Sequence, residues 1–514
     1  MARHIRLEYL LTSKNQNNMK TKLYTIAMSL LAVITTVSCD SFLDDQPRGY
    51  AIPETTANYE GMFNTVDFTN VLCEDYTKFL SPEILMTPKN VNDLYRCASR
   101  ITPPSAERAF KFETNIYEPA ENCELWAYIY KKIYTFNSII NGVMDSEGGS
   151  EAEKLAILAE ARVGRAWLHF VLAQAFSKPY NANTPDELTI PIVKEADTYA
   201  NDFERASMKE FYDFVTAEME DAVPHMKDIA LHRLRAYKIT GLALLGKMYW
   251  MMGEYQKALE PLREAYTRLK TDNQVSYIRN FNTLLANKYG NRELTISELY
   301  DEEATNGGCL LPYAWSDPQI MWVKQNPMIG GIFYVDYYGA SGYYIKPEHY
   351  AKYNEYDLRR NIIPTHDSMG AETPYPLGTV SDYAQNYGVS VPEVYLALAE
   401  CEARAGDGSR ARSVLEDFRS YRMLTGHEGV PEDVKSKDDL IRFCVDEQDR
   451  EFLADIKNFY NLRRLWNDPL FQDRKPYTHN FDGQTYTMKE ENLYLRLPEG
   501  VLKWNEQWRD DSDQ

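Results

Sequence analysis

The chain lacks the short motifs that mark many enzymes and nucleotide-binding proteins. It contains no HExxH, no GxSxG and no calcium loop of alternating Asp and Asn. Residues 241–247 fit the phosphate-binding pattern GxxxxGK, but Met248 follows where Ser or Thr is required, and the intervening residues are apolar. The eight histidines are scattered, and His169 lies in an apolar stretch typical of a core residue. We therefore predict a non-enzyme without metal or cofactor. A pair of carboxylates for glycoside hydrolysis stays an open alternative, because such a pair is defined in space.

Cysteine is scarce, with seven in 514 residues and no CxxC pair. This absence excludes the usual zinc and thiol-redox motifs. Cys401 and Cys444 lie in apolar helical stretches, and we expect them to be buried thiols. Cys73, Cys97 and Cys123 could form a bridge, but their spacing does not say which two would pair.

The chain also has fewer positively than negatively charged residues. The chain has 56 Lys and Arg against 76 Asp and Glu, a net charge of −20. So acidic a surface repels phosphate backbones, which argues against nucleic acid as a partner. Beyond the N-terminal leader described next, no apolar run resembles a transmembrane helix. About 475 residues then remain, enough for a large body with a sizeable core.

One short apolar run, at 23–37, lies near the N-terminus in the block MKTKLYTIAMSLLAVITTVSCDSFLDDQP. Two lysines precede this run, and small residues lead from it into Cys39. This order is typical of a bacterial lipoprotein signal, in which the cysteine after the cut carries the lipid. We predict a signal peptide over 1–38, with Met19 as the true start, and lipid attachment (palmitate) at Cys39. An unstructured apolar N-terminus is the alternative.

Apolar residues repeat at spacings of three and four through much of the remaining chain. This periodicity predicts helices and a mainly α fold. Trp167 and Trp250 lie within apolar helical runs, and we assign both to the core. The predicted helices cover 120–142, 151–176, 208–223, 233–252, 255–270, 391–405, 409–422 and 438–466.

Two regions share a finer pattern of small and apolar residues. Gly246, Gly253, Ala258, Leu262 and Ala265 match the tetratricopeptide grid, in which a small residue lets two helices approach and a glycine turns the chain. The same grid recurs 153 residues later, around 399–418. We predict two helical hairpins, dispersed in the sequence rather than arranged in tandem.

The stretch from about 281 to 389 has a different composition. Ten of the 25 glycines lie between 290 and 388, and 13 of the 38 tyrosines lie between 300 and 387. A long stretch without helical periodicity inside a compact body is usually functional. Tyr and Trp held on glycine-rich backbone suit a binding surface for sugars or extended peptides. Packing of these rings onto the helices is the alternative for any single tyrosine.

Several blocks, in this order, resemble the SusD/RagB family of outer-membrane lipoproteins of Bacteroidetes. They are the leader into Cys39; 130–143; EARVGRAWLHFVLAQAFSKPY at 160–180 with 190–193; the hairpin 236–265; YNEYDLRR at 353–360; PEVYLALAECEARAG at 392–406; and EQDREFLADIKNFYNLRRL at 447–465. The resemblance implies one SusD-like domain over 39–514, with a lipid-anchor linker at 39–55. It implies helix pairs of tetratricopeptide type and long irregular ligand-binding loops, including the insertion at about 281–389.

The resemblance also implies a function. The protein would lie lipid-anchored in the outer membrane, facing the cell exterior, and would pass a captured glycan to a SusC-like TonB-dependent transporter for import. RagB-like members take up peptides, so peptide cargo is the first alternative. A non-catalytic surface scaffold, or an unrecognised hydrolase built on helical hairpins, is the second.

Because binding loops diverge within such a family, candidate ligand-binding residues are chosen by chemistry and region. The aromatic rings would stack on sugar faces, and the arginine would bond hydroxyls or an acidic group. The candidates are Tyr95 and Arg96, in a segment 73–118 that we expect to be irregular, and Tyr313, Trp315, Trp322, Tyr334 and Tyr338 in the insertion.

Overall fold

Antiparallel helices make up most of the described structure. The computed structural model describes residues 53–71, 75–97, 102–271, 275–299, 316–326, 342–367, 369–377 and 385–509. The longer helices are α6 Glu124–Gly142, α7 Glu151–Phe176, α8 Met208–Ala222, α9 Lys238–Met251, α10 Tyr255–Thr271, α14 Val391–Ala405, α15 Gly408–Ser420, α16 Lys437–Glu451 and α17 Ile456–Leu465. The shorter ones are α2 Thr56–Met62, α3 Val66–Thr69, α4 Pro88–Cys97, α5 Pro103–Phe110, α11 Asn287–Tyr289, α12 Ile296–Leu299, α13 Pro347–Tyr350 and α18 Glu499–Leu502. The predicted mainly α fold is confirmed.

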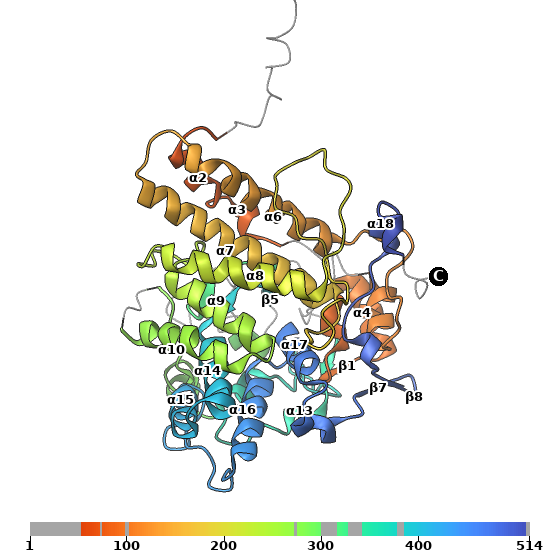
Figure 1. Cartoon of the computed structure of the whole chain (residues 1–514). Helices are drawn as coiled ribbons and strands as arrows, with labels where there is room; N and C mark the ends of the chain where they lie inside the picture. The colour runs from red at the N-terminus through yellow and green to blue at the C-terminus, as the bar shows by residue number, and fades with distance from the viewer. Residues whose placement is uncertain are drawn as a thin grey trace, which may run out of the picture. The chain divides into compact units, whose positions relative to one another are not determined.

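The first layer of long helices follows directly from its sequence signals. Ser150 caps α7 in a reciprocal capping box with Glu153, and Ser207 caps α8 in the same way with Glu210. Nearly every residue of α7 after its second turn is buried, because α6 and α8 both pack against it. Figure 1 shows α6, α7 and α8 lying side by side.

The two predicted hairpins are confirmed as α9–α10 and α14–α15. A Cβ atom at Gly246 would lie 2.5 Å from Cγ of Leu262, so only glycine allows α9 and α10 this close approach. Gly253 turns the chain between them with φ +76°. In the second hairpin Ala399 and Leu415 take the equivalent buried positions. Helix α10 also packs on α14, so the hairpins adjoin although they are far apart in sequence.

The prediction of a single helix over 438–466 is wrong. The chain leaves α16 at Phe452, passes through Ala454 at φ 60°, and starts α17 at an N-cap, Asp455, whose side chain accepts from the Lys457 N–H. The buried carboxyl of Glu83 accepts from the Ala454 N–H. A cap and a distant partner thus stabilise a break that apolar periodicity alone does not reveal.

Strands are few and short in the described ranges. They form antiparallel pairs: β1 Ile84–Leu85 with β4 Tyr344–Ile345, β2 Ile320–Trp322 with β6 Val389–Ser390, β3 Gln325–Asn326 with β5 Gln385–Asn386, and β7 Thr478–Phe481 with β8 Gln484–Thr487. Three of these pairs use residues of the predicted insertion. The pair of β1 with β4 ties the described part of the insertion to a distant segment of the body, whereas the other two pairs join strands within the insertion or at its end.

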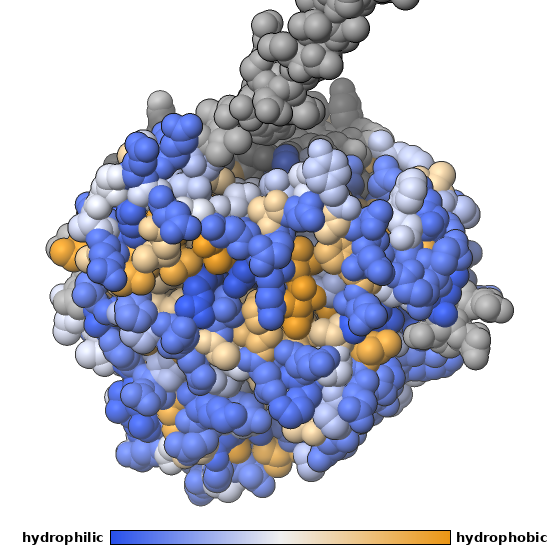
Figure 2. All heavy atoms as spheres, turned by 45° about the horizontal axis from the view of Figure 1, so that its top comes forward, coloured by the Kyte–Doolittle hydropathy of each residue, from blue (hydrophilic) through white to orange (hydrophobic). Residues whose placement is uncertain are grey.

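Several residues assigned to the core from sequence are buried. Trp167 and Trp250 are 2% and 3% exposed. Cys401 and Cys444 are buried free thiols, as predicted, and Cys123 is also free and buried, whereas the structure does not describe the thiols of Cys73 and Cys97. Figure 2 shows a face dominated by hydrophilic residues, with hydrophobic ones exposed in small patches. Of the helices that the structure describes, none is long and apolar enough to cross a membrane.

Candidate functional site

The predicted ligand-binding residues fall into three groups. Tyr95 lies on α4 with 66% of its surface exposed. Arg96 follows it in the same helix, but its side chain lies outside the described part of the chain. Tyr313, Trp315, Tyr334 and Tyr338 also lie outside the described residues. Trp322 is described and is buried.

Helix α4 presents Tyr95 from an ordered frame. The segment 73–118, predicted to be irregular, instead contains α4 and α5, which pack on each other. Thr87 and Asn90 stabilise the start of α4, since the Asn90 side chain accepts from the Thr87 N–H at 2.8 Å. A helix without Gly in its interior holds an exposed ring in a defined place, which suits stacking on a ligand.

The insertion lies directly beside α4. Tyr344 of β4 is buried next to α4, where burial raises its pKa and Lys89 and Asp93 contribute opposing electrostatic effects. Its ring meets that of Tyr375 at a centroid distance of 5.7 Å. Through β4, the insertion also pairs with β1, three residues before α4. Helix α4, which carries Tyr95, and the described part of the insertion are therefore spatial neighbours, as one shared binding face requires.

Trp322 occupies a different environment. It is 1% exposed, and β2, which carries it, is paired with β6. The Nζ atom of Lys324 lies 4.2 Å from its ring centroid, and burial holds the pKa of that lysine well below its usual range. In this structure the ring packs in the core and offers no face to a ligand, so Trp322 fits a structural role.

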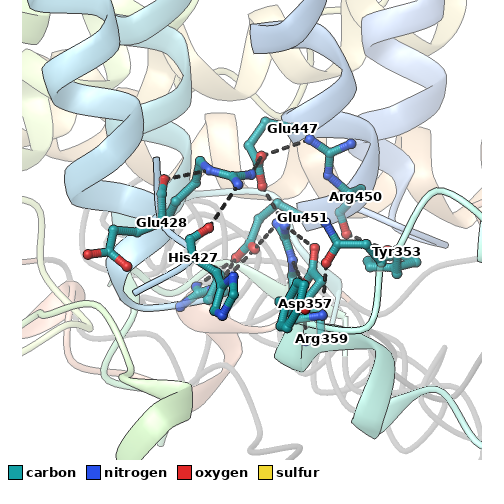
Figure 3. Close-up of polar contacts among 12 residues, drawn as sticks. Tyr353, Asp357, Arg359, His427, Glu428, Glu447, Arg450 and Glu451 are labelled. Atoms are coloured by element: carbon teal, nitrogen blue, oxygen red, sulfur yellow. Dashed lines mark hydrogen bonds and ion pairs between the residues drawn. The ribbon is translucent and has the colours of Figure 1, made fainter. Parts of the chain in front are cut away.

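A buried cluster of arginines and carboxylates, shown in Figure 3, joins the insertion to α15 and α16. Glu447 of α16 is fully buried and accepts from Arg359, from Arg419 at 2.8 Å and from Arg450 at 2.8 Å. Arg359 also pairs with Asp357 at 2.7 Å. Arg450, Arg359 and Arg419 hold the pKa of Glu447 well below its usual range despite the opposing effect of burial.

The cluster continues through Arg422, which is also fully buried. Its guanidinium pairs with Glu451 at 2.7 Å and donates to the Arg279 carbonyl and to Gln319, both at 2.7 Å. Tyr353 donates to the Arg450 carbonyl at 2.6 Å. The cluster thus joins Arg279, just before the insertion, and residues 319 and 353–359 of the insertion to α15 and α16. Its carboxylates are bonded to arginines, so we assign it a structural role in holding the insertion on the helical hairpins.

The phosphate-loop pattern and His169, both considered in the sequence, lie in buried helices. The segment 241–247 lies inside helix α9, and Lys247 pairs with Glu393 at 2.5 Å. The segment is therefore a helix and not a phosphate-binding loop, as predicted. His169 is fully buried: its Nε2 accepts from the Val193 N–H at 3.1 Å, so Nδ1 carries the proton donated to the Arg165 carbonyl. Among the described residues no group of three or more His, Cys, Asp or Glu could hold a metal ion.

Part of the chain matches a family model. Residues 54–250 match the family model SusD-like_3, described as "Starch-binding associating with outer membrane". No curated protein matches the chain. The fold of the chain is similar to that of solved SusD superfamily proteins.

Solved structures share this fold along most of their length. A SusD superfamily protein from Bacteroides vulgatus aligns with TM-score 0.63 and 16% identity, over 89% of this chain and 98% of the other. Surface glycan-binding protein A from Bacteroides uniformis aligns with TM-score 0.56 and 15% identity, over 83% and 94%. A laminarin-binding SusD-like protein aligns with TM-score 0.54 and 17% identity, over 87% and 96%.

Proposed function

We propose that this protein captures a glycan at the cell surface and delivers it to a SusC-like TonB-dependent transporter, without cleaving it. The observation that carries the proposal is the SusD-like family match combined with an exposed aromatic side chain, Tyr95, on a helix that adjoins the aromatic insertion. The relatives described as glycan-binding and laminarin-binding support a saccharide as cargo.

The proposed mechanism assigns different tasks to different parts of the fold. Tyr95 and the rings of Tyr313, Trp315, Tyr334 and Tyr338 stack on the apolar faces of sugar units. Arg96 bonds sugar hydroxyls or an acidic group. The hairpins and the arginine–carboxylate cluster give a rigid base, so that the loops can supply specificity without disturbing the frame.

The proposal includes anchoring of the protein. Residues 1–38 act as the signal peptide, Cys39 carries the lipid, and a linker over 39–55 connects it to a single SusD-like domain in 39–514. The expected location is the outer membrane, facing the exterior. Substitution Cys39→Ala should move the protein from the membrane fraction to the soluble fraction; copurification of wild-type protein with a TonB-dependent transporter would support the partnership.

Calorimetric titration tests the cargo. The chain beginning after Cys39 is titrated with neutral and acidic polysaccharides and with oligopeptides, and the titrations are repeated with Tyr95→Ala and Trp315→Ala. A control variant is Tyr199→Ala, which removes a ring that is 91% exposed outside the insertion. Saccharide binding lost only in the first two variants supports the proposal. Peptide binding alone would overturn the glycan in favour of peptide cargo, and binding of neither class would favour a scaffold.

A further inference from the structure

Four large hydrophobic side chains are exposed close together, and none of them is assigned above to the glycan. The described residues expose eleven such side chains in all, and three of these, Ile229, Leu231 and Leu234, fall within six positions of the loop that leads into α9. Ile229 is 70% exposed and Leu231 is 74% exposed. The fourth is Tyr277, which is 56% exposed. We call these four residues the apolar patch. Clustered hydrophobic side chains on a surface that is otherwise hydrophilic commonly mark an interaction site.

Hydrogen bonds hold the patch in place. The Lys238 N–H donates to the Lys227 carbonyl at 2.9 Å, which closes the loop at its two ends. Within the loop, Nη1 of Arg233 donates to the Val275 carbonyl at 2.9 Å. This bond joins the loop to the segment that carries Tyr277, two residues further along the chain. Because the loop is already fixed, little conformational entropy is lost when a partner covers it.

A cavity of about 350 Å³ lies beside the patch. Ile229 forms part of its wall and is largely exposed, so the cavity is reached from the surface. Ile239 of α9 and Leu269 of α10 extend the apolar lining. Asp228 and Arg268, which pair at 3.4 Å, add a polar edge. An apolar centre with a polar edge is the usual anatomy of a protein interface. A side chain of another protein would fill this cavity, whereas a flat lipid surface would leave it empty.

The patch adjoins α2, the first helix after the proposed lipid-anchor linker. Glu60 of α2 pairs with Lys227 at 2.5 Å, and one of its oxygens lies 3.7 Å from Nη1 of Arg235, so α2 contacts both ends of the loop. Thr56, the first residue of α2, follows Cys39 by 17 residues. A chain of that length spans at most about 60 Å. A protein embedded in the membrane that holds the lipid of Cys39 is therefore within reach of the patch.

The patch is also well separated from the glycan site. Figure 1 shows α10, which lines the cavity, on the left and α4, which carries Tyr95, on the right. A protein that covers the patch therefore leaves Tyr95 open to a glycan.

We propose that the apolar patch is the surface that docks on the SusC-like transporter. An extracellular loop of the transporter covers the patch, and an apolar side chain of that loop enters the cavity. The inference rests on the proposed function, because it assigns a surface to the partnership with the transporter. Ile229 and Leu231, the two most exposed aliphatic residues of the patch, lie at the centre of the contact and contribute most of its binding energy.

Copurification of the full-length, lipid-bearing protein from detergent-solubilised outer membranes tests this surface. The double variant Ile229→Asp with Leu231→Asp places two charges in the apolar centre of the proposed contact. Both side chains are exposed, so the substitutions leave the core intact. The control is Tyr199→Asp, which places a charge at a ring that is 91% exposed outside the patch. Mass spectrometry identifies and quantifies the TonB-dependent transporter that copurifies with each variant.

We expect the double variant to lower the yield of transporter by at least about tenfold, as for residues that dominate an interface, and Tyr199→Asp to leave it unchanged. Glycan titration and thermal melting should be unchanged in both variants. In a second measurement, p-benzoylphenylalanine replaces Leu231, and irradiation of intact cells should give an adduct with the transporter.

Two sets of results would overturn the docking surface. If the double variant retains the transporter, or if the adduct forms only with lipid or with a second copy of this chain, the surface is wrong although the proposed function stands. If wild-type protein binds glycan but copurifies with no transporter, the docking surface and the delivery step fail together, and only glycan capture stands.

Discussion

Replacing Glu447 by glutamine should destabilise the protein strongly, because this carboxylate is the centre of the buried cluster in Figure 3. Three arginines, Arg359, Arg419 and Arg450, bond to it, and its exposed fraction is 0%. Glutamine keeps the shape of the side chain but removes its charge. Its NH₂ group would also point a donor at a guanidinium, which has only donors to offer.

The size of the effect follows from burial. Removing one partner of a buried ion pair costs about 3–5 kcal/mol, since the remaining charge stays desolvated and unneutralised. The matched control is Glu187→Gln, which breaks the partly exposed pair of Glu187 and Lys178, with side chains 38% and 49% exposed. Exposed pairs contribute about 0–1 kcal/mol, so the control should lose little.

Urea unfolding followed by circular dichroism measures both variants under one set of conditions. We expect the free energy of unfolding of Glu447→Gln to fall by at least 2 kcal/mol more than that of Glu187→Gln, as an order-of-magnitude margin. Since the cluster holds the insertion on α15 and α16, ligand binding by the folded variant should also weaken. Equal losses in the two variants would refute the view that the cluster is a buried, interdependent unit.

Three further predictions concern packing, pH and the division between core and site. Substitution Gly246→Ala should lower stability by about 1–3 kcal/mol in thermal or urea unfolding, because the new Cβ atom collides with Leu262; an unchanged midpoint would contradict the close approach. Burial lowers the pKa of His169 to about 4, below the value of about 6.5 in an unfolded chain, so the unfolded state binds more protons and stability falls as pH drops from about 6.5 toward 4. The loss of stability caused by His169 reaches about 3 kcal/mol at low pH, and His169→Gln should flatten the stability–pH curve between about pH 6.5 and 4. An unaltered slope in the variant would show that His169 is not the group responsible. Finally, Trp322→Ala should lower the free energy of unfolding by about 3–5 kcal/mol, because the ring is buried. Tyr95→Ala should leave the melting temperature unchanged and weaken glycan binding in calorimetry. If Tyr95→Ala destabilised the protein and Trp322→Ala weakened only binding, Tyr95 would be the core residue and Trp322 the ligand-binding one.

The helices and their hairpins were determined largely by the sequence itself. The predicted helix 151–176 coincides with α7 because a capping box and a long apolar pattern act between residues that are near neighbours in the chain. Gly246 and Gly253 likewise predicted the first hairpin, since a close contact and a left-handed turn each need glycine. Local signals of this kind do not depend on the rest of the molecule.

Only the tertiary structure decided the surroundings of single side chains. Trp322 is aromatic and lies in a glycine-rich stretch, as a binding residue would, yet pairing of β2 with β6 buries it. The partners of Glu447 come from positions as distant as Arg359. The physical reason is that periodicity reports which face of a helix is buried, whereas hydrogen bonds and charge pairs depend on segments that meet only when the whole chain is folded.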